Sequence, residues 1–385
     1  MIADTQDISM IRDAARAVGS RFDLDYWREC DTELKYPWEF INAMAEGGWL
    51  GTLIPEAYGG MGLGLEAASA MLQEVAYFGG ANAASAIHFS VFGPGPVIRH
   101  GSEEMKRKYL PSIASGETLM CLGLTEPAAG VDTSRLTTRA ERRDGRWVIN
   151  GQKVWITNAQ NAHRILLVAR TSPRNPEKPY DGFTLFFTDN NKDAITARPI
   201  PKMARNAVDS NELFIENLEV PDEHVVGEVG KGFKYLLDGL NPERIVVAWA
   251  QIGLARRALD LAVEYAKTRV VFDRPIGKNQ AIAHPLADSW IRLEGAQLMA
   301  EKAARLFDQE LPCGPEANAA KFLATEAAFE ACDRAMQTHG GFCYAREYHI
   351  ERLWREARLL KIAPVSQEMV LNFVSNKILG LPRSF

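Results

Sequence analysis

Cysteine is scarce and scattered in this chain of 385 residues. The five cysteines, Cys30, Cys121, Cys313, Cys332 and Cys343, are odd in number, and no two of them have the Cys-x-x-Cys spacing. A zinc site or a disulfide framework needs cysteines paired at characteristic intervals. We therefore expect free thiols, no metal site and a reducing, cytoplasmic location.

A basic excess and long apolar runs are also missing. The formal net charge is -5 at pH 7, whereas proteins that bind nucleic acids or anionic membranes usually carry a positive excess. No apolar run reaches the roughly 20 residues that a membrane-spanning helix needs. Residues 1–11 contain Asp4 and Asp7 and no apolar segment, so we expect no signal peptide. The sequence predicts no nucleic-acid partner and no membrane span.

The patterns that are present change twice along the chain. Residues 1–118 and 229–385 show the apolar spacing of helices, whereas residues 119–228 contain short apolar strands and an Asp144-Gly145 hairpin signal. We predict a mainly α protein with a central β-domain: an N-terminal helical domain, an antiparallel β-barrel and a C-terminal four-helix bundle. The clearest helices are expected at residues 67–78, 81–92, 245–268, 281–307 and 317–337.

One stretch, residues 240–250, is largely apolar on every side, which is typical of a helix buried all round. Asn241 and Pro242 resemble an N-cap and a first helical position, which would put Glu243 in the first turn. Burial raises the pKa of a carboxyl group, whereas a helix N-terminus and a neighbouring guanidinium such as Arg244 lower it. Glu243 could therefore be a capping carboxylate or a group that exchanges a proton.

Four further stretches have ordinary structural interpretations when each is taken alone. Residues 124–132 begin Leu-Thr-Glu-Pro and would form a turn. Trp155, in the string Trp-Ile-Thr-Asn, would be a core residue. Arg269 would be a solvated cation at a helix end, and Gly340-Gly341 would stop a helix.

In their order along the chain, these stretches resemble those of the acyl-CoA dehydrogenase family of flavoenzymes, and the similarity runs from about Ile8 to the C-terminus. The resemblance implies FAD as cofactor. The isoalloxazine ring would be lined by Leu122, Leu124, Thr125, Trp155, Ile156 and Thr157, because the indole offers a flat apolar wall and the threonine a hydrogen-bond donor. The pyrophosphate and adenine end would be bound by Arg269, Phe272 and Gln280, with Gln337, Gly340 and Gly341 reaching it from a neighbouring subunit. Ser366 and Glu368 would also contribute to the cofactor site.

The chain departs from the common family pattern near its C-terminus. In much of the family the catalytic glutamate follows an Ile-Tyr pair, but here Ala363 and Pro364 occupy that place, and proline cannot abstract a proton. A smaller branch, including isovaleryl- and long-chain-type enzymes, places the glutamate on the buried helix directly before an arginine. Glu243-Arg244 matches that placement, so we predict Glu243 as the catalytic base. Glu368 corresponds to a residue that is not the base in the family.

The implied reaction is the α,β-dehydrogenation of an acyl-CoA thioester to the 2-enoyl-CoA. Glu243 would take the α-proton while the β-hydrogen leaves as hydride to flavin N5. Val131 stands where many members carry a serine that contacts the substrate. The other residues expected at the substrate are Asn241, Arg244, Ala363 and Pro364. Because Ala363 is small, we expect branched or bulky acyl groups in fatty-acid or branched-chain metabolism.

The resemblance also implies a homotetramer that passes electrons to an electron-transferring flavoprotein. Two alternatives remain open. One is a flavoenzyme of the same fold with different chemistry, such as an oxidase, a desulfinase or a carrier-protein thioester dehydrogenase. The other is a non-catalytic subunit that pairs with an active relative.

Overall fold

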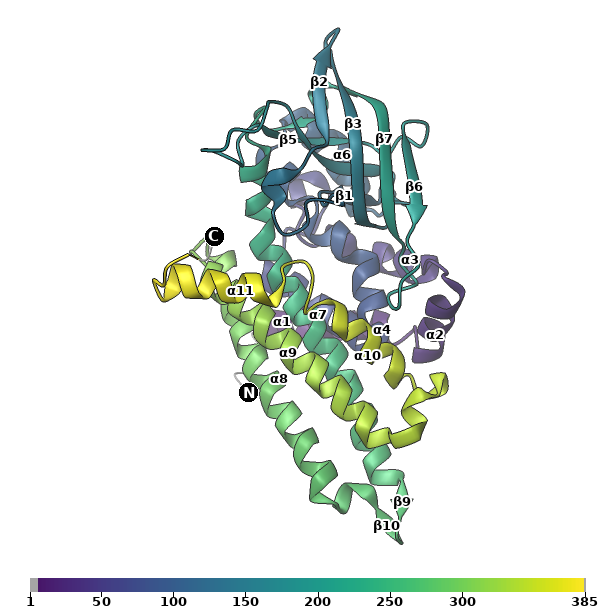
Figure 1. Ribbon diagram of the computed structural model, residues 1–385. Helices are drawn as coiled ribbons and strands as arrows, with labels where there is room; N and C mark the ends of the chain where they lie inside the picture. The colour runs from purple at the N-terminus through teal and green to yellow at the C-terminus, as the bar shows by residue number, and fades with distance from the viewer. Residues whose placement is uncertain (1–5, 384–385) are drawn as a thin grey trace.

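A sheet occupies one end of the molecule and long helices run from it to the other end (Figure 1). The computed structural model describes residues 6–383. Along the chain, helices are followed by the sheet and then by helices again, as predicted. Between residues 6 and 383, no helix is long and apolar enough to cross a membrane. All five cysteines are free and buried, which confirms the prediction of unpaired thiols.

The N-terminal helices are organised around one buried helix, α4. Its two predicted halves form a single element that is interrupted at Gly80, where φ is +68°. A side chain at Gly80 would collide with the Glu356 carboxylate, so glycine is needed for both its conformation and its lack of a side chain. The helices of this region are α1 (Gln6–Gly19), α2 (Leu24–Glu33), α3 (Trp38–Glu46), α4 (Leu65–Phe92), α5 (Gly95–His100) and α6 (Glu103–Ala114).

The central sheet has eight strands in the order β6-β7-β3-β2-β4-β5-β8, with β1 paired to β4. Asp144 and Gly145 both have positive φ, 48° and 77°, which confirms the two-residue hairpin turn that they predict. The strands are β1 (Met120–Gly123), β2 (Arg139–Arg143), β3 (Arg146–Thr157), β4 (Arg164–Arg170), β5 (Phe183–Asp189), β6 (Ile195–Pro199), β7 (Ser210–Pro221) and β8 (Val225–Val226).

The expected antiparallel barrel is wrong in two respects. β1 and β2 both pair with β4 in parallel, so the sheet is mixed. In the described part of the chain the strand order runs from β6 to β8 without closing. Hairpin signals report only strands that are neighbours in sequence, and the β1–β4 pairing is not of that kind.

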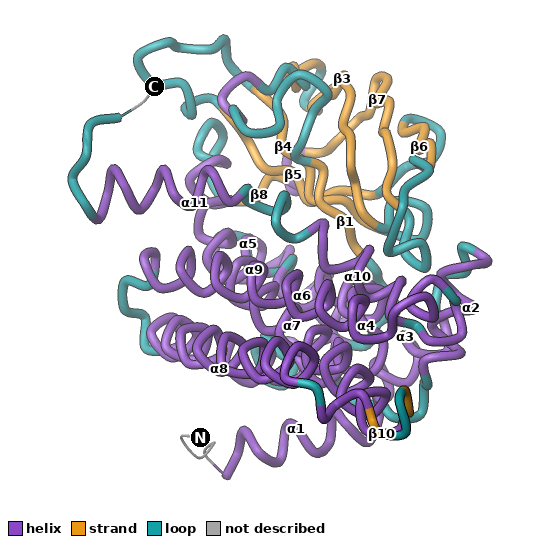
Figure 2. Tube along the Cα trace, turned by 60° about the horizontal axis from the view of Figure 1, so that its bottom comes forward, coloured by secondary structure: helices purple, strands orange, loops and turns teal. Residues whose placement is uncertain are grey.

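The C-terminal region is built on α7, α8 and α9, which lie alongside one another (Figure 2). The long helix α4 also packs along α7, so the bundle includes a helix from the N-terminal region. The elements are α7 (Gly232–Thr268), β9 (Val270–Val271), β10 (Arg274–Pro275), α8 (Gln280–Asp308), α9 (Gly314–His339), α10 (Ile350–Leu359), α11 (Gln367–Phe373) and a π-helical turn (Val374–Ile378).

The predicted start of the buried helix is wrong. α7 begins at Gly232, and Pro242 lies inside it rather than at its first position. The helix extends this far upstream because Phe233 and Leu236 are buried against the apolar cluster under the sheet. Glu243 is therefore more than two turns from the N-terminus, where the effect of the helix dipole is weak.

Candidate active site

Glu243 is largely enclosed by protein. Its side chain is partly accessible, while Ile245 and Val246 beside it are buried. Burial raises the pKa of the Glu243 carboxyl group to about 7, and the charge of Arg244 opposes this rise. A carboxyl group with a pKa near neutrality can both accept and release a proton, which is what a general base requires.

Arg244 supplies positive charge next to Glu243, and a buried lysine lies near Arg244. Arg244 donates a hydrogen bond from Nη1 to Asn241 Oδ1 at 3.0 Å. The charges of both Arg244 and Glu368 act on Lys321 of α9, so these three side chains from α7, α9 and α11 lie near one another. Lys321 is fully buried, and its Nζ has no hydrogen-bond partner between residues 6 and 383. Burial lowers its pKa to about 8.

The loop that carries Ala363 and Pro364 is attached to α9. Gln367 donates hydrogen bonds from Nε2 to Thr325 Oγ1 at 3.0 Å and to Glu326 Oε1 at 2.8 Å. Lys361 Nζ bonds the other oxygen of Glu326 at 2.8 Å. This attachment holds the loop against α9, and the charges of Lys361 in the loop and of Arg244 on α7 both act on Lys321 of that helix.

The alternatives to Glu243 at this point are less suited to proton abstraction from a buried carbon. Pro364 is exposed and has no acidic group. Glu368 is exposed in the first turn of α11, and hydrogen bonds from its own backbone N–H and from Ser366 lower the pKa of its carboxyl group. Ser366 caps α11 by accepting a hydrogen bond from Met369 N.

The predicted flavin-ring residues come together on the sheet. The register of β3 against β7 shifts between Lys153 and Ile156, which marks a bulge. Trp155 lies in this bulge with a φ of +61°, and its indole is 58% exposed. Bulges of this kind turn a side chain out of the regular alternation. Val154 N donates to Thr125 O at 2.9 Å, so the Leu122–Thr125 and Trp155–Thr157 segments are neighbours, as predicted.

A buried ion pair, which the sequence motifs do not indicate, supports the two segments that carry Thr125 and Trp155. Lys153 Nζ donates to Glu126 Oε1 at 2.9 Å and to Leu124 O at 3.0 Å, and both charged side chains are buried. Glu126 also accepts hydrogen bonds from the backbone N–H groups of Thr137 and Thr138. The pKa of Glu126 is lowered to about 2, because Lys153 and these donors outweigh its burial.

The predicted pyrophosphate residues lie together at the far end of the bundle. A cavity of about 440 Å³ is lined by Arg269, Gly340, Gly341 and Phe342, among others. The Arg269 guanidinium lies 5.5 Å from the centre of the Phe342 ring. Side chains built on the two glycines would meet nothing within 4 Å, so the backbone is open to a ligand. An exposed guanidinium beside bare backbone fits a pyrophosphate group.

Arg269 and the Gly340-Gly341 pair line the same cavity of one chain. That the glycine stretch reaches the cofactor of a neighbouring subunit stays a prediction. The sheet that carries Trp155 and the β9–β10 hairpin that follows Arg269 lie at opposite ends of the molecule (Figure 1). One chain does not bring the two halves of the predicted FAD site together.

The remaining predicted residues lie at the surface. Phe272 sits at the tip of the β9–β10 hairpin and is 92% exposed. Gln280 begins α8, and Gln337 lies near the end of α9; both are exposed. Val131, 66% exposed, lies in the loop after β1, where no hydroxyl replaces the serine of other members.

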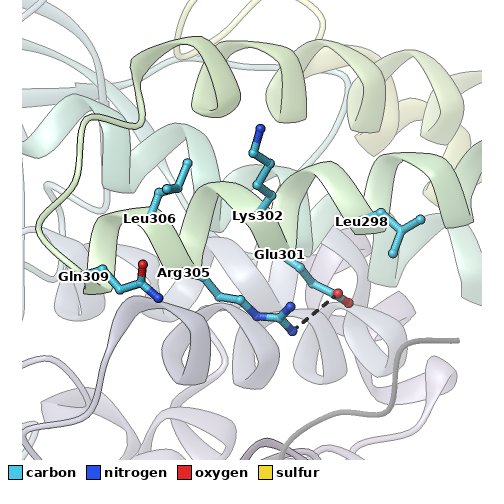
Figure 3. A pocket seen from close by; sticks show the side chains of 6 residues that line it. All are labelled: Leu298, Glu301, Lys302, Arg305, Leu306 and Gln309. Atoms are coloured by element: carbon cyan, nitrogen blue, oxygen red, sulfur yellow. Dashed lines mark ion pairs between the residues drawn. The ribbon is translucent and has the colours of Figure 1, made fainter.

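A second hollow, of about 370 Å³, contains none of the predicted site residues. It is lined by five side chains of α8 and by the residue that follows this helix, shown in Figure 3: Leu298, Glu301, Lys302, Arg305, Leu306 and Gln309. Arg305 pairs with Glu301 at 3.6 Å and with Glu66 of α4 at 2.8 Å. The charged side chains are thus satisfied by one another, and this hollow is not a candidate catalytic site.

Comparisons with known proteins give the family. Sequence profiles described as the N-terminal, middle and C-terminal domains of acyl-CoA dehydrogenase match residues 5–117, 121–218 and 230–379. This chain belongs to the acyl-CoA dehydrogenase family. The acyl-CoA dehydrogenase fadE12 of Mycobacterium bovis is 35% identical over 388 residues, covering 99% of this chain and 98% of the relative.

Two further relatives of this acyl-CoA dehydrogenase bear on its partners and fold. The caffeyl-CoA reductase-Etf complex subunit CarC of Acetobacterium woodii is 32% identical, covering 96% of this chain and 97% of that protein. The solved butyryl-CoA dehydrogenase of Megasphaera elsdenii superposes with a TM-score of 0.93 at 30% identity, covering 98% of this chain and 100% of that one. The chain is an oxidoreductase of this family, whose cofactor is FAD.

Proposed function

We propose that this acyl-CoA dehydrogenase removes the α- and β-hydrogens of an acyl-CoA thioester and that Glu243 is its base. The observation that carries the proposal is the environment of Glu243: a partly accessible carboxyl group on α7 whose pKa burial raises to about 7. The family resemblance supplies the second support, since Glu243-Arg244 stands where one branch of the family carries its base.

The residues around Glu243 assist proton abstraction in two ways. Asn241 accepts the hydrogen bond of Arg244 and so fixes the guanidinium one turn from the base. Arg244 supplies positive charge that favours Glu243 in its ionised, proton-accepting form. When FAD is bound, its flavin ring accepts the hydride that leaves the β-carbon.

The thioester carbonyl also needs a hydrogen-bond donor, because negative charge develops on its oxygen as the α-proton leaves. Pro364 cannot supply this donor since it has no N–H. Val365 is the next residue of the loop that has one, and the Gln367–Glu326 and Lys361–Glu326 contacts hold this loop against α9. We assign Val365 N–H as the donor that replaces the missing amide.

We propose a homotetramer in which each FAD is shared between subunits. The separation of Trp155 from Arg269 within one chain supports this, because a second copy must complete each cofactor site. α8 also presents a row of exposed apolar side chains, Trp290, Ile291 and Leu298, with exposed fractions of 56%, 62% and 49%. Exposed apolar rows of this kind are common at subunit interfaces.

We also propose an electron-transferring flavoprotein as the acceptor, because CarC, named as the subunit of an Etf complex, is similar to this chain over nearly its whole length. The five free, buried cysteines support a reducing compartment such as the cytoplasm.

The experiment is an anaerobic titration of the purified, yellow protein with a panel of straight, branched and aryl acyl-CoA thioesters. We expect the flavin absorbance to bleach, the enoyl-CoA to form in equal amount, and air to restore the colour only slowly. Rapid reoxidation by air would instead identify an oxidase. Failure of every thioester to bleach a fully flavin-loaded protein would leave a non-catalytic partner subunit as the better account.

A further inference from the structure

The second half of α4 lies alongside the part of α7 that carries Glu243. The two helices run antiparallel: Ala76 and Ala84 of α4 contact Ala250 of α7. Further along, a side chain at Gly239 of α7 would meet Pro96, just after α4. From residue 84 to residue 96, the neighbouring residues on α7 therefore run backwards from 250 to 239. By this pairing, residues 88–92 lie beside residues 243–247.

Both helices carry partly accessible side chains at this level. Between Gly79 and Phe92, His88 and Phe89 are the two side chains of α4 that are not buried. On α7, Glu243 and Val247 lie one turn apart and are both partly accessible, whereas Ile245 and Val246 between them are buried. Because residues 88–92 lie beside residues 243–247, a substrate tail that starts at Glu243 and follows these accessible side chains would reach His88.

The His88 ring carries a hydrogen-bond acceptor at its Nε2 atom. Its Nδ1 lies 2.8 Å from the carbonyl oxygen of Ser85, and since a carbonyl only accepts, Nδ1 carries the proton. Nε2 is then the acceptor nitrogen of the ring, because the one hydrogen bond of the imidazole that involves residues 6–383 is made at Nδ1. Burial and the charge of Arg205 lower the pKa of His88 to about 3, so the ring is neutral at physiological pH.

The Arg205 guanidinium supplies a hydrogen-bond donor near His88. Lys202 Nζ donates to the carbonyl oxygens of Arg205 and Val208, at 2.8 and 2.9 Å, which fixes the loop around Arg205. Ala207 N donates to Asn82 Oδ1 at 3.0 Å, which holds this loop on α4 six residues before His88, about 9 Å along the helix. The guanidinium is partly accessible, and the charge of the Glu356 carboxylate acts on it without an ion pair within 4 Å between residues 6 and 383.

We propose that His88 and Arg205 recognise a hydroxyl group on the tail of the acyl substrate. One hydroxyl group satisfies both: its O–H donates to His88 Nε2 and its oxygen accepts from the guanidinium. A carboxylate would meet the Nε2 lone pair, and a plain hydrocarbon tail would leave both groups unpaired in a desolvated site. The rings of Phe89 and Phe92, 4.3 and 5.6 Å from His88, form an apolar wall beside this end. This assignment rests on the proposed acyl-CoA substrate and names its class.

The test uses ligands that bind but cannot react, so that it does not depend on turnover. In 3-thia analogues, sulfur replaces the β-carbon and dehydrogenation is blocked. Calorimetry on the FAD-loaded protein would compare (4-hydroxyphenylthio)acetyl-CoA with (phenylthio)acetyl-CoA, and 8-hydroxy-3-thiaoctanoyl-CoA with 3-thiaoctanoyl-CoA. The two pairs distinguish an aryl from an aliphatic hydroxyl. We expect at least one pair to show a hydroxyl preference of roughly five- to tenfold in Kd, the size of one net hydrogen bond.

Substitutions of His88 and Arg205 then test whether these two residues cause the hydroxyl preference. His88→Phe removes the acceptor and keeps a ring of similar size, so the hydroxyl preference should fall to about one. His88→Gln retains an acceptor oxygen and should keep most of the preference, which separates recognition from a defect in folding. Arg205→Met should also reduce it. Equal binding within both pairs by the wild-type protein, or an unchanged preference in His88→Phe, would overturn the inference. A hydroxyl preference in a protein whose flavin no acyl-CoA reduces would instead refute the proposed dehydrogenation and leave this assignment standing.

Discussion

Lys153 and Glu126 form an ion pair of 2.9 Å inside the sheet domain, directly behind the segments that carry Thr125 and Trp155. Removing one member of a buried pair leaves the other charged and unpaired, which costs about 3–5 kcal/mol. We therefore expect Glu126→Ala to lower the free energy of unfolding by this amount in urea titrations. Glu141→Ala, which breaks an exposed pair with Arg143, is the matched control and should cost less than about 1 kcal/mol. Equal losses in the two variants would contradict the supporting role of the buried pair.

The rate of flavin reduction should depend on pH through Glu243. The base must be ionised to accept the α-proton, and its pKa is raised to about 7. kcat/KM should therefore rise about tenfold per pH unit below pH 7 and level off above it. Glu368 has a lowered pKa and would already be ionised throughout this range. A flat profile between pH 5 and pH 8 would accordingly argue against Glu243.

FAD retention should depend on Arg269. Arg269→Ala removes the guanidinium from the cavity that also contains Gly340 and Gly341, and should weaken FAD binding by about 1.5–3 kcal/mol, the range for hydrogen bonds to charged groups. Arg274→Ala is a matched control, because Arg274 lies nearby on β10 but does not line the cavity. The measurement is the flavin-to-protein absorbance ratio after dialysis. Equal retention by both variants would show that Arg269 is dispensable.

The assembly should be a homotetramer that depends on the exposed row of α8. Light scattering should give four times the subunit mass for the wild-type protein and a smaller assembly with less FAD for Ile291→Glu. Leu34→Glu places the same charge at a residue that is 71% exposed on the N-terminal region, and should leave the assembly intact. An FAD-loaded, active monomer would refute both the tetramer and the shared cofactor site.

The sequence predicts the order of helices, sheet and helices because the apolar period changes at each transition. It does not predict the start of α7, since Asn241-Pro242 is a local capping signal, whereas the burial of Phe233 and Leu236 is a tertiary effect. The parallel β1–β4 pairing escapes prediction for a similar reason: no local signal records which distant strand a segment will join.

The sequence predicts the site residues that belong to recognisable motifs. It does not predict those whose role depends on tertiary packing. The resemblance drew attention to Trp155, but not to the bulge that exposes its indole or to the Lys153–Glu126 pair behind it. Lys321 did leave a signal: it lies on the alanine-lined face of α9, in step with Ala317 and Ala324, where a lysine is unexpected. A charged residue within an apolar stripe of a helix therefore indicates a buried polar site.

The central claim, that Glu243 is the base, is tested most directly by stopped-flow reduction of Glu243→Gln with an acyl-CoA that bleaches the wild-type flavin. Glutamine keeps the shape and hydrogen-bonding capacity of the side chain but cannot accept the proton, so FAD and ligand should still bind. We predict that flavin reduction slows by at least ~10²–10⁴-fold, the contribution of a positioned general base. Glu368→Gln, the control, should reduce its flavin at nearly the wild-type rate. Near-wild-type reduction by Glu243→Gln would contradict the assignment.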